Sequence, residues 1–393
     1  MLNNISGGKT FGSKEKYYLS LGFFMFSGGL SGIFINILFF VTSNLESVII
    51  YQIALQISQT IFFIISTYLM KVISARYLFI SGNILRALTI ALLFVIPYLS
   101  QNALFFGLLI GVSSGIFWSG NATFSLEISK GSNRMVFLSI NSAISSVASL
   151  ISPTLGGLLI SYSNFHGLYR YSMDFALSSI LLLLSSLTAT FIKNNGEKGG
   201  SFSIKTTIIK EKNYSRYRAF FFFSSILGMA MSTLIPVYIY YLSGSYIVAG
   251  IYGSVTALGG FLSNIMAPML SRKLGKKIIY VIPVMLISSI LFTFHLSYSI
   301  ILVFIASLII LLFLTPLSNM GMSDFMQYLD KFTRTRHFWI NREYYLVSGR
   351  ILSLISILAY SDLFSLYSST ILMPFFALSL LGFIPVFRMR SDI

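Results

Sequence analysis

The sequence predicts an all-α polytopic membrane protein with 12 transmembrane helices, arranged as two pseudo-symmetric six-helix bundles. Three observations lead to this fold class. The chain has 393 residues, of which 55% are hydrophobic and only 10% are charged, whereas about 25% of the residues in a soluble domain are charged. Its apolar stretches reach the length of about 20 residues that a membrane span needs. Its basic residues gather in alternate connections between these stretches, as in membrane proteins.

The composition also excludes several functional classes. Cysteine is absent, which rules out disulfides, thiolate metal sites and Cys nucleophiles. The three histidines, His166, His295 and His337, are scattered without the paired spacing of metal ligands, so we expect neither a metal nor another cofactor. The net charge of +16 fits basic loops on one side of a membrane better than binding to nucleic acid.

The expected helices follow from the apolar stretches, taken in chain order. They lie at residues 17–41, 47–69, 77–98, 102–126, 136–162, 172–192, 217–242, 247–270, 278–297, 299–321, 340–362 and 367–387. The first stretch follows a short polar tail that has no small-residue cleavage site. We therefore expect a retained helix there and not a signal peptide.

The basic residues predict the orientation of these helices. All but three of the 27 lie in the terminal tails or in and beside every second loop, the exceptions being Arg86, Arg170 and Arg350. Lys and Arg accumulate on the cytoplasmic side of membrane proteins. We therefore expect both termini and the long loop at 193–216 in the cytoplasm. The expected location is the lipid bilayer of the plasma membrane, and the expected state is a monomer.

The long loop also divides the chain into a bundle at 1–192 and a second bundle at 217–393. The basic turn "KVISARYL", which begins at Lys71, falls opposite "RKLGKKII", which begins at Arg272. Each turn joins two spans. Repeated halves with a binding region between them are the common plan of secondary transporters.

These features resemble the major facilitator superfamily, in which turns after helices 2 and 8 carry a small residue followed by Asp-Arg-x-Gly-Arg-Lys. The second turn fits this signature at four positions, Lys273, Gly275, Lys276 and Lys277. Its acidic position is occupied by Arg272, and the matching place in the first half by Lys71. The resemblance makes the fitting residues gate candidates, although the acid that helps to latch the family's inward gate is missing from both copies.

The segment "SPTLGG", Ser152 to Gly157 in the fifth expected helix, is similar to the Gly-Pro-x-x-Gly-Gly signature of proton-coupled exporters. Pro153 is expected to bend the helix. Gly156 and Gly157 let it approach a neighbouring helix closely. Packing alone explains the pattern as well as a transport role does.

Polar residues inside the spans are functional candidates because lipid leaves them unsatisfied. Gln52, Gln56 and Gln59 on the second helix are spaced i, i+4 and i+7, which places them on one face. This face must meet protein or water. The amides either line a substrate path or bond neighbouring helices, where such bonds contribute about 0.6 kcal/mol each.

In the superfamily plan helices 1, 4, 7 and 10 line the central path. By resemblance, four residues on these helices are candidate substrate contacts: Asn36, Trp118, Asn121 and Asn319. Glu127 and Asp324 lie near the headgroups and are expected to pair with basic loop residues or to act in a gate. Arg86 lies roughly 14 Å into the third helix and is expected to snorkel or to bond a neighbouring helix, with function as the alternative.

The eleventh helix carries Glu343 at headgroup level and Arg350 about 10 Å deeper on the same face, too far apart for a direct ion pair. Arg342 can pair with Glu343 at the membrane surface. Glu343 is explained either as a solvated acid at a helix N-terminus or as the titrating group of transport. Arg350 is expected to face the interior and to meet carbonyls, the glutamines of the second helix or an anionic substrate. The resemblance favours the glutamines, because helices 2 and 11 pack across the two halves in the superfamily.

The leading hypothesis is a secondary active transporter of a small, amphipathic solute, working by alternating access and by export coupled to protons or another ion. It depends on the few buried charges, the 16% of aromatic residues and the exporter-like fifth helix. The alternatives are uptake of a polar or anionic nutrient with Arg350 as the anion anchor, a lipid flippase or scramblase, and a sensor without transport. An enzyme is disfavoured, because the sequence has no GxxxxGK[ST] loop and no Ser/His/Asp constellation.

Overall fold

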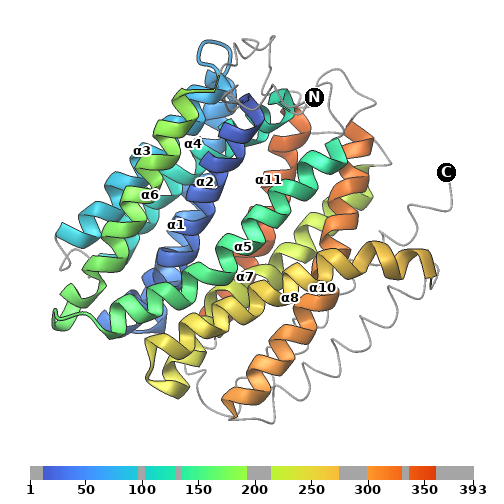
Figure 1. The fold of residues 1–393 in the computed structure, drawn as a ribbon. Helices are drawn as coiled ribbons and strands as arrows, with labels where there is room; N and C mark the ends of the chain where they lie inside the picture. The colour runs from blue at the N-terminus through green and yellow to red at the C-terminus, as the bar shows by residue number, and fades with distance from the viewer. Residues whose placement is uncertain are drawn as a thin grey trace, which may run out of the picture.

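The computed structural model describes residues 12–95, 102–128, 134–192, 214–273, 299–329 and 336–359. These residues form long α-helices joined by short connections (Figure 1). The helices are α1 (Ser13–Thr42), α2 (Leu45–Leu69), α3 (Ala75–Val95), α4 (Ala103–Ile128), α5 (Arg134–Ser161), the short 3₁₀ helix η2 (Gly167–Tyr171), α6 (Ser172–Thr190), α7 (Ser215–Ser243), α8 (Tyr246–Lys273), α10 (Ile300–Leu329) and α11 (Arg336–Ala359).

The expected helices that fall within the described residues are all present, which confirms the all-α membrane fold. Eight of them are long and apolar enough to cross a membrane, and Ile300–Leu312 is a shorter apolar segment. The helices expected at 278–297 and 367–387 lie outside the described residues. Several helices run past their expected ends: α10 continues to Leu329, and α11 already begins at Arg336. Hydropathy marks only the part of a helix that lipid covers, whereas the helix itself continues into less apolar sequence.

Two groups of helices pack side by side. In the first, α4 packs on α2 and α3, while α6 packs on α1 and α3. In the second, α7 packs on α11 and α8, and α8 packs on α10. The two groups meet where α5 lies along α8, where α11 lies along α2, and where α1 contacts α7 (Figure 1).

Glycines bring α4 into backbone contact with its neighbours. Gly107, Gly111 and Gly115 lie on one face, spaced by four residues, and each faces the backbone of α2. A Cβ atom added to Gly111 would lie 2.5 Å from the carbonyl oxygen of Leu55. Small residues spaced in this way allow membrane helices to associate closely through van der Waals packing. The first half is therefore assembled with almost no side-chain layer between α2 and α4.

Serine hydroxyls connect α1 to α6. The Ser20 hydroxyl donates to the Ser185 carbonyl oxygen at 2.7 Å, and the Ser27 hydroxyl donates to the Ser178 carbonyl oxygen at 2.9 Å. Asn83 on α3 donates to the Ser185 hydroxyl at 3.0 Å. We call these contacts the serine seam. It satisfies buried polar groups within the protein, as a lipid environment requires.

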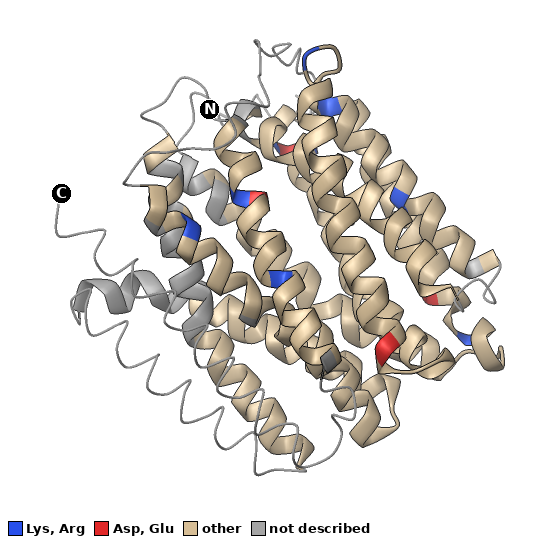
Figure 2. Cartoon of the chain, turned by 180° about the vertical axis from the view of Figure 1, so that it is seen from behind, with Lys and Arg blue, Asp and Glu red and all other residues tan. Residues whose placement is uncertain are grey.

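The two ends of the bundle differ in charge. We call the end where α1 and α3 begin the basic end, because it carries Lys14, Lys16, Lys71 and Arg76. Lys16 and Arg76 donate there to the carbonyl oxygens of Phe191 and Ile192 after α6. The opposite end holds the connections from α1 to α2, from α5 to α6 and from α7 to α8. Charged residues are sparse along the helices between the two ends (Figure 2).

Candidate functional site

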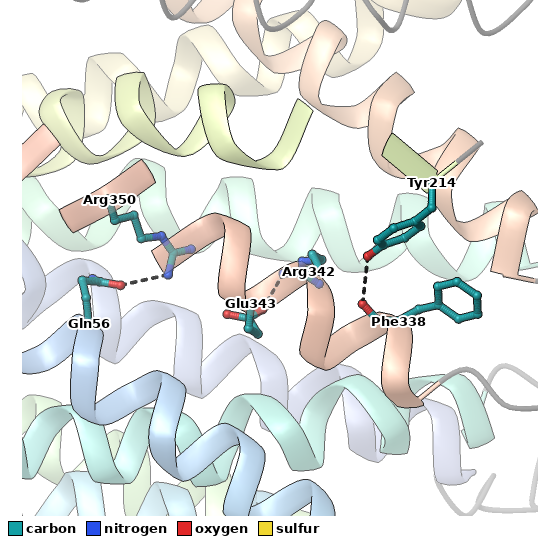
Figure 3. Close-up of polar contacts among 6 residues, drawn as sticks. All are labelled: Gln56, Tyr214, Phe338, Arg342, Glu343 and Arg350. Carbon is teal, nitrogen blue, oxygen red and sulfur yellow. Dashed lines mark hydrogen bonds and ion pairs between the residues drawn. The ribbon is translucent and has the colours of Figure 1, made fainter. Parts of the chain in front are cut away.

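Polar side chains from three helices meet where the two halves touch. On α2, the Gln52 Nε2 atom donates to Asn36 Oδ1 of α1 at 2.7 Å, and both residues are buried. One turn further along α2, Gln56 Oε1 accepts a hydrogen bond of 2.9 Å from Arg350 Nη1 of α11 (Figure 3). The expected contact between the glutamines of α2 and Arg350 is confirmed. We call Asn36, Gln52, Gln56 and Arg350 the polar junction.

Arg350 projects from α11 into the junction, and at the neighbouring residue Gly349 this helix packs closely against α7. A Cβ atom added to Gly349 would lie 2.2 Å from the Phe222 carbonyl oxygen. The Arg350 side chain is half-buried. Gln56 is its hydrogen-bond partner among the described residues, so most of its five N–H donors have no partner in that part of the chain. Gln56 is neutral and brings no negative charge to Arg350.

Glu343 lies about two turns from Arg350 towards the start of α11 and is only 5% exposed. The interpretation of Glu343 as a solvated helix-terminal acid is therefore wrong. Because α11 begins at Arg336, Glu343 lies two turns inside the helix. The expected partner is confirmed, since Arg342 Nη2 lies 3.2 Å from Glu343 Oε1 (Figure 3). The Arg342 guanidinium also stacks on Trp339, 5.0 Å from the ring centroid.

Open space borders the glycines of α1 beside the polar junction. A Cβ atom added to Gly28 or Gly32 would meet no atom within 4 Å. Gly32 precedes Asn36 by one turn and lies on the same helix face. Gly29 differs, because its Cβ would clash with the Ser152 hydroxyl of α5. The face of α1 that carries Gly32 and Asn36 thus borders open space at Gly28 and Gly32.

Three other candidates make contacts outside the junction. Asn121 Oδ1 accepts a hydrogen bond of 2.9 Å from the Tyr17 hydroxyl, near the basic end of α1. Trp118 packs edge-on against Phe24, with 5.8 Å between the ring centroids. Gln59 is half-buried, and its carbonyl oxygen lies 2.4 Å from where a Cβ atom on Gly115 would be.

Arg86 behaves as the inter-helix interpretation expects, because its guanidinium lies 5.4 Å from the Phe24 ring centroid of α1. For the remaining gate and path candidates, the structure gives at most the helix on which each residue lies. Glu127 lies on α4, Asn319 and Asp324 on α10, and Lys273 at the end of α8. Their side chains, and the whole of Gly275 and Lys276, lie outside the described residues.

The "SPTLGG" segment holds α5 against α8 near the end opposite the basic end. A Cβ atom on Gly157 would lie 2.5 Å from the Tyr246 carbonyl oxygen, and one on Gly250 would lie 2.4 Å from the Pro153 carbonyl oxygen. The Thr154 and Ser254 hydroxyls hydrogen-bond at 2.7 Å. The close approach expected of this segment is confirmed, and it joins the two halves. Gly156 faces α1 and α6 instead.

Two features escaped the sequence reasoning. The glycine row of α4 reads "GLLIGVSSG" from Gly107 to Gly115, and its four-residue spacing is a signal that could have identified it. Asp174 is fully buried near the start of α6. It is the sole acid of the apolar stretch at 172–192, and an acid inside a span is a signal in its own right.

The comparisons with known proteins agree with this geometry. A profile of the Major Facilitator Superfamily matches residues 18–333. The chain belongs to this superfamily. The suspected resemblance is therefore confirmed, and with it the all-α fold of an integral multi-pass membrane protein.

Relatives of this Major Facilitator Superfamily chain are similar over most of its length. The uncharacterized protein YqgE of Bacillus subtilis (strain 168) is 26% identical over 353 residues, which cover 86% of this chain and 80% of that protein. The crystal structure of the nucleoside transporter NupG matches with a TM-score of 0.69 at 12% identity, covering 97% of this chain and 100% of NupG. A bacterial homologue of the iron transporter ferroportin, in its outward-facing state, matches with a TM-score of 0.69 at 14% identity, covering 97% and 100%. At these identities the structures show the shared fold.

Proposed function

We propose that this chain is a secondary active transporter that carries a small, amphipathic solute across the plasma membrane by alternating access, with the polar or anionic group of the solute bound at Arg350. The observation that carries the proposal is the Arg350–Gln56 hydrogen bond, 2.9 Å long, between the two halves. A ligand bound there contacts both halves. Its binding energy therefore depends on how the halves are arranged, which is the requirement for coupling a ligand to a conformational change.

The electrostatics of the junction support an anionic or strongly accepting group. An arginine at the centre of a membrane helix costs about 2.5–3.5 kcal/mol on insertion scales. Gln56 supplies one acceptor but no charge, and Glu343 is engaged by Arg342. A carboxylate or a phosphate accepts two parallel hydrogen bonds from a guanidinium. The open space beside Gly28 and Gly32 leaves room for the apolar part of the solute.

The contact between α5 and α8 supports alternating access. It closes the bundle near the end opposite the basic end, through Gly157 and Gly250. We assign the basic end to the cytoplasm because Lys and Arg accumulate on that side. The tight contact then closes the outer side of the protein. Rocking of the halves about the polar junction opens one side as it closes the other.

Proton-coupled export is the direction that we propose. It draws on the similarity of "SPTLGG" to the signature of proton-coupled exporters and on Glu343, an acid buried on the same face of α11 as Arg350. Uptake of an anionic nutrient is the second candidate. The N–H donors of Arg350 that have no partner among the described residues favour it, since they suit an anchor for a fully charged solute.

Transport by the purified protein in proteoliposomes tests the function and its direction. The vesicles hold a trapped pH-sensitive dye and receive a panel of labelled solutes: an aromatic carboxylate, a phosphate ester, a nucleoside and a hexose. For export, we expect solute to leave the vesicles as protons enter down an inward proton gradient, so that the trapped dye reports acidification of the lumen. Movement of solute and proton in the same direction supports the second candidate. Flux of a fluorescent lipid without flux of any solute would contradict both, and vesicles without protein are the control.

Replacement of Gly157 by leucine is expected to hold the outer end open. The new side chain must displace the Tyr246 backbone, because even a Cβ atom would lie 2.5 Å from its carbonyl oxygen. The readout is the labelling of Ser254→Cys, on α8 in the same interface, by a membrane-impermeant maleimide. The chain has no native cysteine, so no background arises. We expect labelling at least tenfold faster than in the Ser254→Cys protein with Gly157 intact. The control is Gly228→Leu, at an exposed position with open space around it. Gly167→Leu is unsuitable, because Gly167 has a φ of 61°, which a leucine would adopt only with strain.

A further inference from the structure

Asp174 has an enclosed carboxylate without a partner. The residue is 0% exposed, and neither Oδ1 nor Oδ2 has a hydrogen-bond partner among the described residues. A Cβ atom built on Gly156 would lie 2.9 Å from Asp174 Oδ1, 2.6 Å from the Phe34 ring and 3.0 Å from the Leu30 carbonyl oxygen. The carboxylate therefore lies where α1, α5 and α6 converge, and the missing side chain of Gly156 leaves the space for it.

The ordinary explanation for an acid near a helix start does not apply to Asp174. Such an acid usually accepts hydrogen bonds from the free N–H groups of the first turn. Here η2 runs directly into α6, and the Ser172 N–H group already donates to the Tyr169 carbonyl oxygen. The carboxylate oxygens of Asp174 accept no hydrogen bond from this turn.

The groups around Asp174 provide no compensating charge. The titratable and charged side chains at this end of the packed elements include Tyr169, Arg170 and Tyr171 on η2, Tyr246 on α8 and Tyr240 on α7, and α3 carries Arg86 further along. Arg170 is turned to the Tyr246 ring, 5.4 Å from its centroid. Arg86 is turned to Phe24, and α3 reaches α6 nearby at Ser185, about three turns from Asp174. The outer parts of α1 and α5 contain no ionisable residue.

A proton resolves this mismatch. An ionised carboxylate buried without a cation or donors costs several kcal/mol, and such a group takes up a proton instead. The protonated carboxyl becomes a donor, and the Leu30 carbonyl oxygen borders the same space as Asp174 Oδ1. In the closed arrangement seen here, Asp174 is therefore compatible with its surroundings only in the neutral form.

The carboxyl group lies directly behind a contact between the two halves. The Tyr171 hydroxyl, one turn before Asp174, donates to the Tyr246 hydroxyl of α8 at 3.1 Å. Gly157, the neighbour of Gly156, packs on the Tyr246 backbone. Separation of α8 from α5 and η2 breaks these contacts and uncovers the junction of α1, α5 and α6. Water can then reach the Asp174 carboxylate, which is shielded from water in the closed arrangement.

We propose that Asp174 is a proton-binding site, and that closure of the end opposite the basic end requires its protonation. When this end opens, the Oδ–H bond of Asp174 breaks, its proton passes to a water molecule, and the hydrated carboxylate remains. On closure a hydronium ion returns the proton to the same oxygen. The proposal rests on the alternating access proposed above and adds to it the group whose charge decides which arrangement is stable.

Distance measurements between spin labels test the link to closure. The labels are attached to Asn164→Cys, in the connection that follows α5, and to Ser243→Cys, at the end of α7, in a chain free of native cysteine. We expect the long-distance population to grow as the pH rises, by up to tenfold in the open-to-closed ratio per pH unit for a single proton. Asp174→Asn keeps the size of the side chain and stays closed at every pH. Glu46→Gln removes an exposed acid at the same end and keeps the wild-type response.

Infrared spectroscopy of the unlabelled protein tests the proton itself and needs no transport. We expect the carbonyl-stretch band of a protonated carboxylic acid at neutral pH in the wild type and in Glu46→Gln, and its loss in Asp174→Asn. Absence of that band, or its survival in Asp174→Asn, overturns the proton site. A wild-type pH response that persists in Asp174→Asn overturns the link to closure. If both tests succeed while the proteoliposomes move no solute, the proton site stands and the transport function alone fails.

Discussion

Replacement of Arg350 by alanine is expected to reduce solute flux by about 10- to 100-fold while the protein still folds and inserts. Hydrogen bonds to a charged group contribute about 1.5–3 kcal/mol, and each 1.4 kcal/mol corresponds to about tenfold in affinity. The fold should persist, because the described partner of Arg350 is the neutral Gln56 and removal of a membrane-buried cation relieves an insertion cost. The measurements are solute flux in proteoliposomes and the thermal unfolding midpoint in detergent.

Two further variants separate binding by Arg350 from mere packing. Arg350→Lys keeps the charge but loses the planar fork that pairs with a carboxylate, so we expect intermediate flux. Gln56→Ala removes the neutral partner alone and should lower flux less than Arg350→Ala does. Ser348→Ala, on an exposed face of α11, is the matched control with wild-type flux. Full activity of Arg350→Ala, or equal losses in Arg350→Ala and Ser348→Ala, would remove the polar junction as the binding site.

Replacement of Gly111 by leucine is expected to abolish the folded monomer. Its Cβ atom alone would lie 2.5 Å from the Leu55 carbonyl oxygen and 2.7 Å from the Ser58 Cβ atom. Overpacking a core costs about 1–3 kcal/mol where side chains can shift. Here the obstacle is backbone, so α4 must separate from α2 along its length, and we expect a larger loss of stability. Size-exclusion profiles and unfolding midpoints in detergent measure the effect.

The matched control for this change is Gly228→Leu on α7. Gly228 is exposed, and a Cβ atom there would meet nothing within 4 Å. The same side chain is thus added to a membrane helix without a clash, and we expect a monodisperse protein. Gly111→Ala should fall between the two. Equal unfolding midpoints for Gly111→Leu and Gly228→Leu would show that the contact between α2 and α4 tolerates separation.

The helices were predictable from the sequence because lipid acts on each segment separately. Every span must satisfy its own backbone, so its length and apolar character appear locally. The ends were less predictable: α11 already includes Arg336, and Phe338 and Trp339 in its first turn pack in an aromatic cluster with Phe325. Glu343 therefore lies inside the helix and is not a solvated terminal acid. Its burial by neighbouring helices does not appear in the hydropathy of α11 alone.

The candidate site was predictable only in part, because its contacts join residues far apart in the chain. Gln56 and Arg350 are 294 residues apart, and the superfamily resemblance, not the local pattern, brought them together. Asp174 escaped attention because an acid near a helix start has an ordinary explanation. Its burial is decided by Phe34 and Gly156, on two other helices. Likewise, the glycines of α4 acquire meaning once α2 is known to lie against them.

The serine seam has a consequence for biosynthesis. Its bonds join residues between Ser20 and Ser185, so the first bundle can complete this pairing while the ribosome is still translating the second. The hydrogen bond of Gln56 differs from the serine seam, because it can form only after Arg350 has been synthesised, hundreds of residues later. The bond that we place in the solute site is therefore among the last to form during synthesis, and it marks a chain whose two halves have assembled.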